Sequence, residues 1–146
     1  MSKNMLVKTQ IKDREALADA LLQVCAGRGI KVQTGDNLTT QRYSSIVHGC
    51  QFVIAKEELR RTGNVSSFGD IGFRQTADGT YEILLDDFDS RDQALANEVK
   101  REYAIAMVTR RAEAQGMRVE FLDDTRQNLR LHPMQTRRPQ ITQRRY

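Results

Sequence analysis

The chain has 146 residues, of which 39% are hydrophobic and 29% charged, a composition typical of one folded domain with its own core. No stretch approaches the roughly 20 apolar residues of a membrane-spanning helix, and the first residues lack a secretory signal, so we expect a cytoplasmic protein that does not enter a membrane. The net charge is +4, but six of the 23 basic residues follow the last carboxylate side chain, Asp124, so residues 1–124 carry 17 basic against 19 acidic side chains and a net charge of −2.

The N-terminal part of the chain predicts a strand, a helix and a second strand. Residues 6–11 alternate and are rich in β-branched side chains, which favours a strand. A helix follows, with Asp13 as its N-cap and with Gly27 and Gly29 at its end. Its apolar positions recur at helical spacing and are Ala16, Leu17, Ala20, Leu21 and Val24. Residues 30–34 are predicted to form the second strand.

The middle of the chain mixes polar connectors with short apolar runs. Residues 35–45 are almost all polar and predict a surface loop. Residues 46–55 predict one long strand, bent or bulged at Gly49. Residues 56–61 predict a single helical turn, and residues 64–69 a flexible connector.

Two apolar segments, residues 70–75 and 81–85, flank a turn and predict a β-hairpin. A two-residue turn would mix polar and apolar side chains on both faces. A three-residue loop that ends in a left-handed Gly79 places Arg74 opposite Glu82 on one face. It gathers the apolar side chains on the other face, namely Ile71, Phe73, Tyr81, Ile83 and Leu85. Because this register separates the two kinds of side chain, it is the one we predict.

The C-terminal part predicts the longest helix and two more strands. The helix begins after a Ser90 cap, ends before Gly116, and carries an apolar stripe of Leu95, Val99, Tyr103, Ala106 and Met107. Residues 118–122 alternate as a strand, and residues 129–131 predict a final one. Beyond Pro133 no apolar periodicity remains.

These elements predict an α+β domain over residues 1–132 and a basic, disordered tail over residues 133–146. Short strands with only two good helices favour an antiparallel or mixed sheet with both helices on one face. A strand, helix, strand order occurs twice, which favours a ferredoxin-like arrangement. The order of the strands in the sheet stays open.

Residues that could carry chemistry are few and scattered. His48 and Cys50 offer two soft metal ligands, to which Cys25 or His132 would have to be added, but the paired spacing of zinc sites is absent. We therefore expect both cysteines to be reduced and packed in the core. The acids of residues 86–89 could hold a magnesium ion, yet their position before a helix explains them as complements of the helix dipole.

No motif in the sequence assigns an enzymatic activity. A serine nucleophile motif, a P-loop and a dinucleotide fingerprint are all missing from the sequence. We therefore predict no catalytic residue, no metal and no cofactor, and we interpret the chain as non-enzymatic.

Arginines are the strongest functional signal. The tail contains Arg137, Arg138, Arg144 and Arg145 and no carboxylate side chain. Guanidinium groups pair with phosphates and carboxylates, so the tail could contact nucleic acid or an acidic protein surface, or could serve only solubility. The nucleic-acid-binding hypothesis also uses a basic patch in the folded part, made of Lys56, Arg60, Arg61 and Arg74.

Four segments carry a resemblance to a known family. They are residues 7–13 with the helix after them, the Asp-Ile-Gly-Phe run of residues 70–73, the Gly-Thr-Tyr-Glu run of residues 79–82, and Tyr103 with the Gln115-Gly116 helix end. Over residues 6–131 the chain resembles an uncharacterised family of cyanobacteria, algal plastids, other bacteria and phages. This family is called a hypothetical chloroplast reading frame, or domain of unknown function twelve-fifty-seven.

The resemblance implies no established activity and no catalytic residues, and it implies an AAA-type ATPase as a frequent companion. Residues 57–67 and the arginine tail look like additions peculiar to this chain. The leading hypothesis is therefore an accessory subunit that binds a protein partner through its sheet edge or this insert. A nucleic-acid-binding module is the alternative, and a small metal-dependent enzyme is the second alternative.

Overall fold

The computed structural model describes residues 4–41, 46–62, 69–86, 90–122 and 128–133, and the chain divides into two compact units, residues 1–104 and 105–146. The described elements in chain order are β1 (Asn4–Lys8), α1 (Arg14–Ala26), β2 (Gln33–Gln41), β3 (Ile46–Ile54), α2 (Lys56–Arg61), β4 (Ile71–Gln75), β5 (Tyr81–Asp86), α3 (Ser90–Ala114), β6 (Met117–Phe121) and β7 (Leu129–Pro133). Helix α3 contributes residues to both units.

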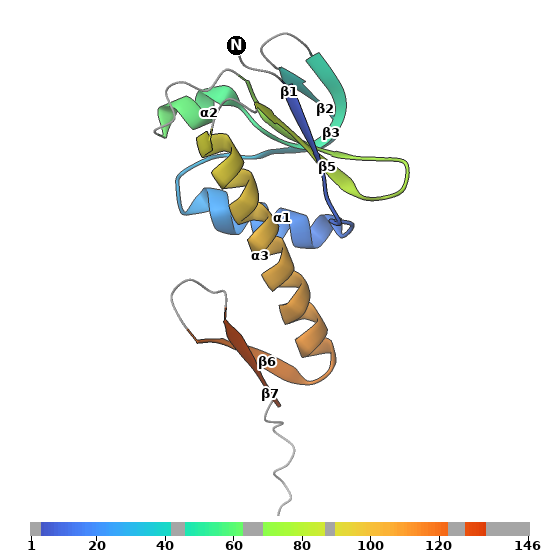
Figure 1. Ribbon diagram of the computed structural model, residues 1–146, viewed down its shortest axis with the longest axis vertical. Coiled ribbons are helices and arrows are strands. Elements are labelled where there is room, and N and C mark those ends of the chain that lie inside the picture. The colour runs from blue at the N-terminus through green and yellow to red at the C-terminus, as the bar shows by residue number, and fades with distance from the viewer. Residues whose placement is uncertain (1–3, 42–45, 63–68, 87–89, 123–127, 134–146) are drawn as a thin grey trace, which may run out of the picture. The chain divides into compact units, whose positions relative to one another are not determined.

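The first unit is built on a five-stranded antiparallel sheet in the order β1-β5-β4-β3-β2. Helix α1 and the first part of α3 pack on one face of this sheet (Figure 1). The predicted α+β class, the antiparallel sheet and the placement of both helices on one face are confirmed.

The ferredoxin-like arrangement is wrong. Strands β2 to β5 follow one another as neighbours, and β1 lies beside β5, whereas a ferredoxin-like sheet interleaves its two halves. The strand after the long helix does not return to the main sheet either, because β6 pairs with β7 in a separate two-stranded sheet. Short connections favour pairing between consecutive strands, and here they decide the topology.

The main core lies between the sheet and its helices. The predicted stripe of α1 is buried, and Asp13 accepts a hydrogen bond from the backbone N–H of Ala16 at 3.1 Å as its N-cap. The sheet contributes the largest fully buried side chains of this core, which include Phe52, Phe73, Tyr81, Ile54, Ile71, Ile83 and Leu85. From α3 come Leu95, Ala96 and Val99.

The β4–β5 hairpin has the predicted three-residue loop. Arg74 faces Glu82, Phe73 faces Ile83, and Gly79 has a φ of +89°, which glycine adopts without steric cost. The loop is held by Asp78, whose carboxylate accepts hydrogen bonds from the hydroxyl groups on either side of it. The separation of polar and apolar side chains was therefore sufficient to determine the register.

The loop predicted over residues 35–45 is wrong for residues 35–41, because β2 runs from Gln33 to Gln41, and residues 42–45 lie outside the described residues. The strand predicted over residues 30–34 therefore begins at residue 33 in the structure, three residues later than predicted, and continues through the polar residues to residue 41. This strand is at the edge of the sheet, and most of its side chains are exposed, so its sequence lacks the apolar alternation of an inner strand. The bend predicted in β3 is present, since Gly49 has a φ of +81° and the β2–β3 register shifts twice.

The segment between β1 and α1 is fixed by two tyrosines of the first unit. The backbone N–H of Tyr81 donates to the carbonyl of Ile11 at 2.8 Å. The hydroxyl of Tyr103 accepts hydrogen bonds from the backbone N–H groups of Lys12 and Asp13, both at 3.1 Å. The segments that carry the family resemblance at this place are thus part of the scaffold.

The second unit contains the last part of α3 and the β6–β7 hairpin. Gly116, with a φ of +75°, ends the helix as predicted and leads directly into β6. In the ladder Val119 faces Leu131 and Phe121 faces Leu129. Among the described residues no helix is long and apolar enough to cross a membrane.

Candidate functional site

The histidines and cysteines considered for metal binding occupy separate places in the described structure. Cys25 lies in the core on α1, where burial raises the pKa of its thiol to about 11 and keeps it protonated. His48 shares a hydrogen bond with Thr39, with 3.3 Å between Nδ1 and Oγ1. His132 lies in the β6–β7 hairpin, 2.6 Å from a Glu120 oxygen. In the described part of the chain, no cluster of three or more metal-ligating side chains forms.

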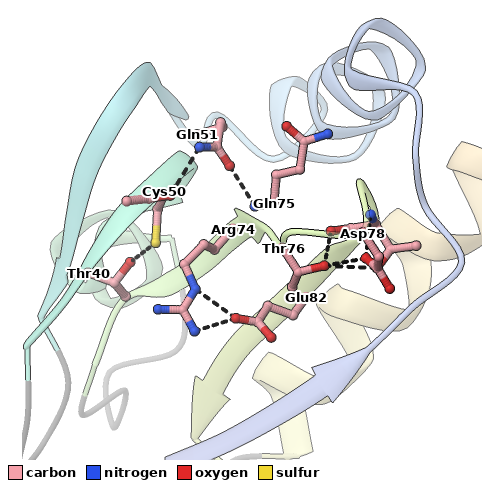
Figure 2. Close-up of polar contacts among 10 residues, drawn as sticks. Thr40, Cys50, Gln51, Arg74, Gln75, Thr76, Asp78 and Glu82 are labelled. Carbon is pink, nitrogen blue, oxygen red and sulfur yellow. Dashed lines mark hydrogen bonds and ion pairs between the residues drawn. The ribbon is translucent and has the colours of Figure 1, made fainter.

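Cys50 packs on the sheet as expected, on the face opposite the helices. Its thiol lies 2.9 Å from the hydroxyl of Thr40, and both side chains are fully buried (Figure 2). The two side chains lie directly over Gly72, where a Cβ atom would come within 2.3 Å of the Thr40 oxygen and 3.2 Å of the Cys50 sulfur. Both cysteines are free thiols. The glycine of the Asp-Ile-Gly-Phe run therefore permits side chains of β2 and β3 to approach β4 closely.

Arg74 and Glu82 form a cross-strand ion pair on the same face. The guanidinium donates through Nε to Oε2 of Glu82 at 2.7 Å and through a second nitrogen to the same oxygen (Figure 2). Beside them, the backbone N–H of Gln75 donates to the side-chain carbonyl of Gln51 at 2.7 Å. These polar groups satisfy one another and link β3, β4 and β5.

Asp70 connects three elements of the first unit. Its carboxylate accepts hydrogen bonds from the backbone N–H groups of Gln41, at the end of β2, and of Lys56, at the start of α2, both at 2.8 Å. Its own backbone N–H donates to the Gln41 carbonyl at 3.0 Å. Because Asp70 satisfies the free N–H at the first turn of α2, it acts as a cap from outside the helix.

The predicted basic patch is divided between two elements. Lys56, Arg60 and Arg61 lie on α2, whereas Arg74 lies on β4 and is paired with Glu82. Arg61 is also paired, with a distance of 2.7 Å to Glu58. The patch stays a prediction, and the charges of Arg61 and Arg74 are compensated inside the protein. The arginines of the tail and the acids of residues 87–89 lie outside the described residues.

A groove of about 570 Å³ lies between α1 and the edge of the sheet that β2 forms. Its helix wall includes Leu21 and Leu22, the opposite wall includes Val32, which directly precedes β2, and Phe52 also lines it. The other lining residues are Ala18, Asp19, Cys25, Ala26, Ile30, Lys31 and Thr34. The surface is thus mainly apolar, with one acidic and one basic side chain among the residues that line it.

Polar contacts fix the helix and the strand that form the walls of this groove. Arg14, in the first turn of α1, donates to the Gly35 carbonyl at 2.9 Å and pairs with Asp36 at 3.1 Å. The Arg14 guanidinium carbon also lies 5.7 Å from the centre of the Phe52 ring, a cation–π geometry. These contacts join α1 to β2 and hold the groove in shape.

Leu22 is a signal of this groove that is visible in the sequence. Leu22 follows the buried Leu21 on α1 but lies outside the predicted stripe, and its side chain is 66% exposed. A leucine beyond the stripe widens the apolar surface of a helix past the arc that the core covers. The position of β2 could not be inferred in the same way, because its polar sequence resembles a loop.

Comparison with known proteins adds a family but no function. The sequence model of a family described as "Protein of unknown function (DUF1257)" matches residues 26–131. Neither the curated proteins nor the solved structures contain a match to this chain.

Proposed function

This chain belongs to the DUF1257 family, whose function is unknown, and from that premise we propose that it is a non-enzymatic accessory subunit that binds a protein partner in the groove beside α1. The groove is mainly apolar and is wide enough for one or two large side chains. An apolar cleft with few charges is typical of a binding site for apolar anchor residues of a partner.

The single observation that carries this proposal is Leu22. A leucine that is 66% exposed at the rim of an apolar groove can become buried by a partner, with a gain that follows the apolar area removed from water. Single exposed leucines are common on protein surfaces, so it is the combination with the groove that favours binding.

The partner's side chains, rather than its backbone, make the contact in this proposal. The edge strand β2 changes register twice against β3, and such irregularities make an edge a poor template for an added strand. Val32, just before β2, and Thr34, within β2, therefore serve only as a wall of the groove. The family resemblance suggests an AAA-type ATPase as the class of partner.

The polar side chains support a scaffold without catalysis. Asp70, Arg74, Glu82 and Tyr103 each hold two segments of the fold together. These contacts explain the four side chains as parts of the scaffold, which supports the proposal of a structural role for them.

The test compares two variants of the same helix. Leu22→Arg places a charge at the rim of the groove, whereas Gln23→Arg adds the same charge at the neighbouring exposed position, which does not line it. Tagged full-length chains purified from the native cell after cross-linking are expected to carry a partner in the wild type and in Gln23→Arg and to lose it in Leu22→Arg. Recovery of the bare chain from wild-type cells, or an unchanged partner with Leu22→Arg, would contradict the proposal.

A further inference from the structure

The outer edge of β6 is open and regular. Among the described residues β6 pairs only with β7, so one side of this strand has no neighbouring strand. The β6–β7 ladder continues from Met117 to Phe121 without a register shift. Natural sheet edges are blunted by bulges or by proline, as β2 is by its shifts and β7 by Pro133. Strand β6 has neither device.

One face of the small sheet is apolar and only partly covered. Alternation places Met117, Val119 and Phe121 of β6 on the same face as Leu129 and Leu131 of β7. Leu131 is 44% exposed, and the three β6 side chains are half-buried. A two-stranded sheet is marginal by itself, and additional strands stabilise it.

The sequence of β6 is complementary to itself when it is reversed. The strand reads Met-Arg-Val-Glu-Phe from residue 117 to residue 121. If two copies pair antiparallel about a two-fold axis at Val119, each Arg118 lies opposite Glu120 of the other chain, and each Met117 lies opposite a Phe121. Opposite charges in directly facing positions stabilise a strand pair, and sulfur atoms pack well against aromatic rings.

The same operation on β7 gives no such match. A two-fold axis at Leu131 would place Arg130 opposite His132, which are two groups without opposite charge. Charge complementarity thus favours β6 rather than β7 as the strand that forms the contact. It also favours a second copy of this chain as the partner rather than a protein of unrelated sequence.

We propose that two copies of this chain associate by antiparallel pairing of their β6 strands, which makes a four-stranded sheet in the order β7-β6-β6-β7. The apolar face then becomes continuous across the two-fold axis. Arg118 and Glu120 are exposed in the single chain. One oxygen of Glu120 already contacts His132 at 2.6 Å, and the other oxygen can face Arg118 of the second copy. This interface is independent of the groove beside α1, and either proposal can fail without the other.

The test uses charge reversal and complementation in the full-length chain. Arg118→Glu leaves two acidic side chains on the edge of β6. The double variant Glu120→Arg with Arg130→Glu leaves two basic ones while it keeps opposite charges facing each other within the hairpin. Each variant alone is expected to weaken self-association by about tenfold or more, because two attractive pairs become repulsive. An equimolar mixture of the two is expected to form the heterodimer.

Sedimentation equilibrium measures these associations, and circular dichroism checks that each variant is folded. Glu113→Arg, an exposed position near the end of α3, is the control and is expected to leave the dimer unchanged. A wild-type chain that stays monomeric up to its solubility limit, a dimer that persists in Arg118→Glu, or a mixture that forms no heterodimer would overturn the proposal.

A cross-linking measurement does not depend on charge. Val119→Cys places two thiols directly opposite each other in the proposed pair, within the Cα separation that a disulfide allows. Leu131→Cys, on the more distant β7, leaves the thiols about three strand spacings apart, roughly 14 Å. Oxidation is expected to link Val119→Cys chains and to leave Leu131→Cys chains unlinked, although Leu131 is well exposed. The reverse result would exclude pairing through β6.

Discussion

Gly72 permits the close approach of β2, β3 and β4, and replacing it tests that interpretation directly. In Gly72→Ala the new Cβ atom would lie 2.3 Å from Oγ1 of Thr40, 3.1 Å from its methyl group and 3.2 Å from the sulfur of Cys50. Thr40 is β-branched, fully buried and bonded to Cys50, so its side chain cannot rotate away without losing that contact. The strands must therefore move apart.

The expected cost follows from overpacking. Inserting a methyl group into a filled core destabilises proteins by about 1–3 kcal/mol, and alanine in a strand would otherwise gain about 0.5–1 kcal/mol over glycine. Because the new Cβ atom would lie far inside van der Waals contact with Thr40, the upper end of the overpacking range applies, and we expect a net loss of about 2 kcal/mol in the free energy of unfolding. With a urea dependence near 2 kcal/mol per molar, the midpoint of urea denaturation falls by about 1 M.

A double-mutant cycle assigns this loss to Thr40. Thr40→Ala removes the two nearest atoms, so in combination with Gly72→Ala it is expected to cost about 1 kcal/mol less than the sum of the two single variants. Gly27→Ala is the matched control, since its φ is −65° and the nearest atom to the new Cβ atom lies at 3.8 Å. Wild-type stability of Gly72→Ala, or strict additivity with Thr40→Ala, would refute the close-approach argument.

Three further predictions concern separate parts of the chain. Asp70→Ala removes the acceptor of two backbone hydrogen bonds and is expected to lower the free energy of unfolding, measured by urea titration, by about 2–3 kcal/mol. The Asp36 side chain is 92% exposed, so the control Asp36→Ala is expected to change this free energy by less than about 0.5 kcal/mol. Burial raises the pKa of Cys25 from 9.0 to about 11, so the stability that the neutral thiol contributes below pH 9 is lost as the pH rises to 11. Between these pH values, the free energy of unfolding measured by urea titration is expected to fall by about 2 kcal/mol more in the wild type than in Cys25→Ala. Parallel pH curves for the two proteins would contradict this. Deleting residues 134–146 is expected to abolish salt-sensitive binding to a polyanion in gel shifts, and equal binding by both forms would dismiss a role for the tail arginines.

Binary pattern predicted the parts of the fold in which one face is buried. The register of the β4–β5 hairpin followed from placing Arg74 with Glu82 and the apolar side chains on the other face. Other features were predicted because each has a local physical cause. They are the apolar stripe and N-cap of α1, the bend at Gly49 and the helix end at Gly116. Such features need no knowledge of distant contacts.

Strand β2 and the strand order could not be predicted in this way. A polar edge strand is stabilised by its backbone hydrogen bonds to β3, and these leave no trace in side-chain periodicity. The ferredoxin-like expectation failed because the pattern of elements does not tell which strand β6 pairs with. The groove depends on the position of β2 and on the strand order, neither of which could be predicted, so Leu22 was the only sign of the groove in the sequence.

The segments that carry the family resemblance and the surfaces proposed for binding do not coincide. Asp70 and Gly72, which belong to the Asp-Ile-Gly-Phe run, bind and pack against distant parts of the same chain. Leu22 and the edge of β6 contact little in the described structure and impose few demands on folding. The fold of this chain therefore requires the first group, whereas the surfaces proposed for binding are not required by it. Experiments on function should accordingly change the groove and the β6 edge first, because changes in the Asp-Ile-Gly-Phe run report on folding.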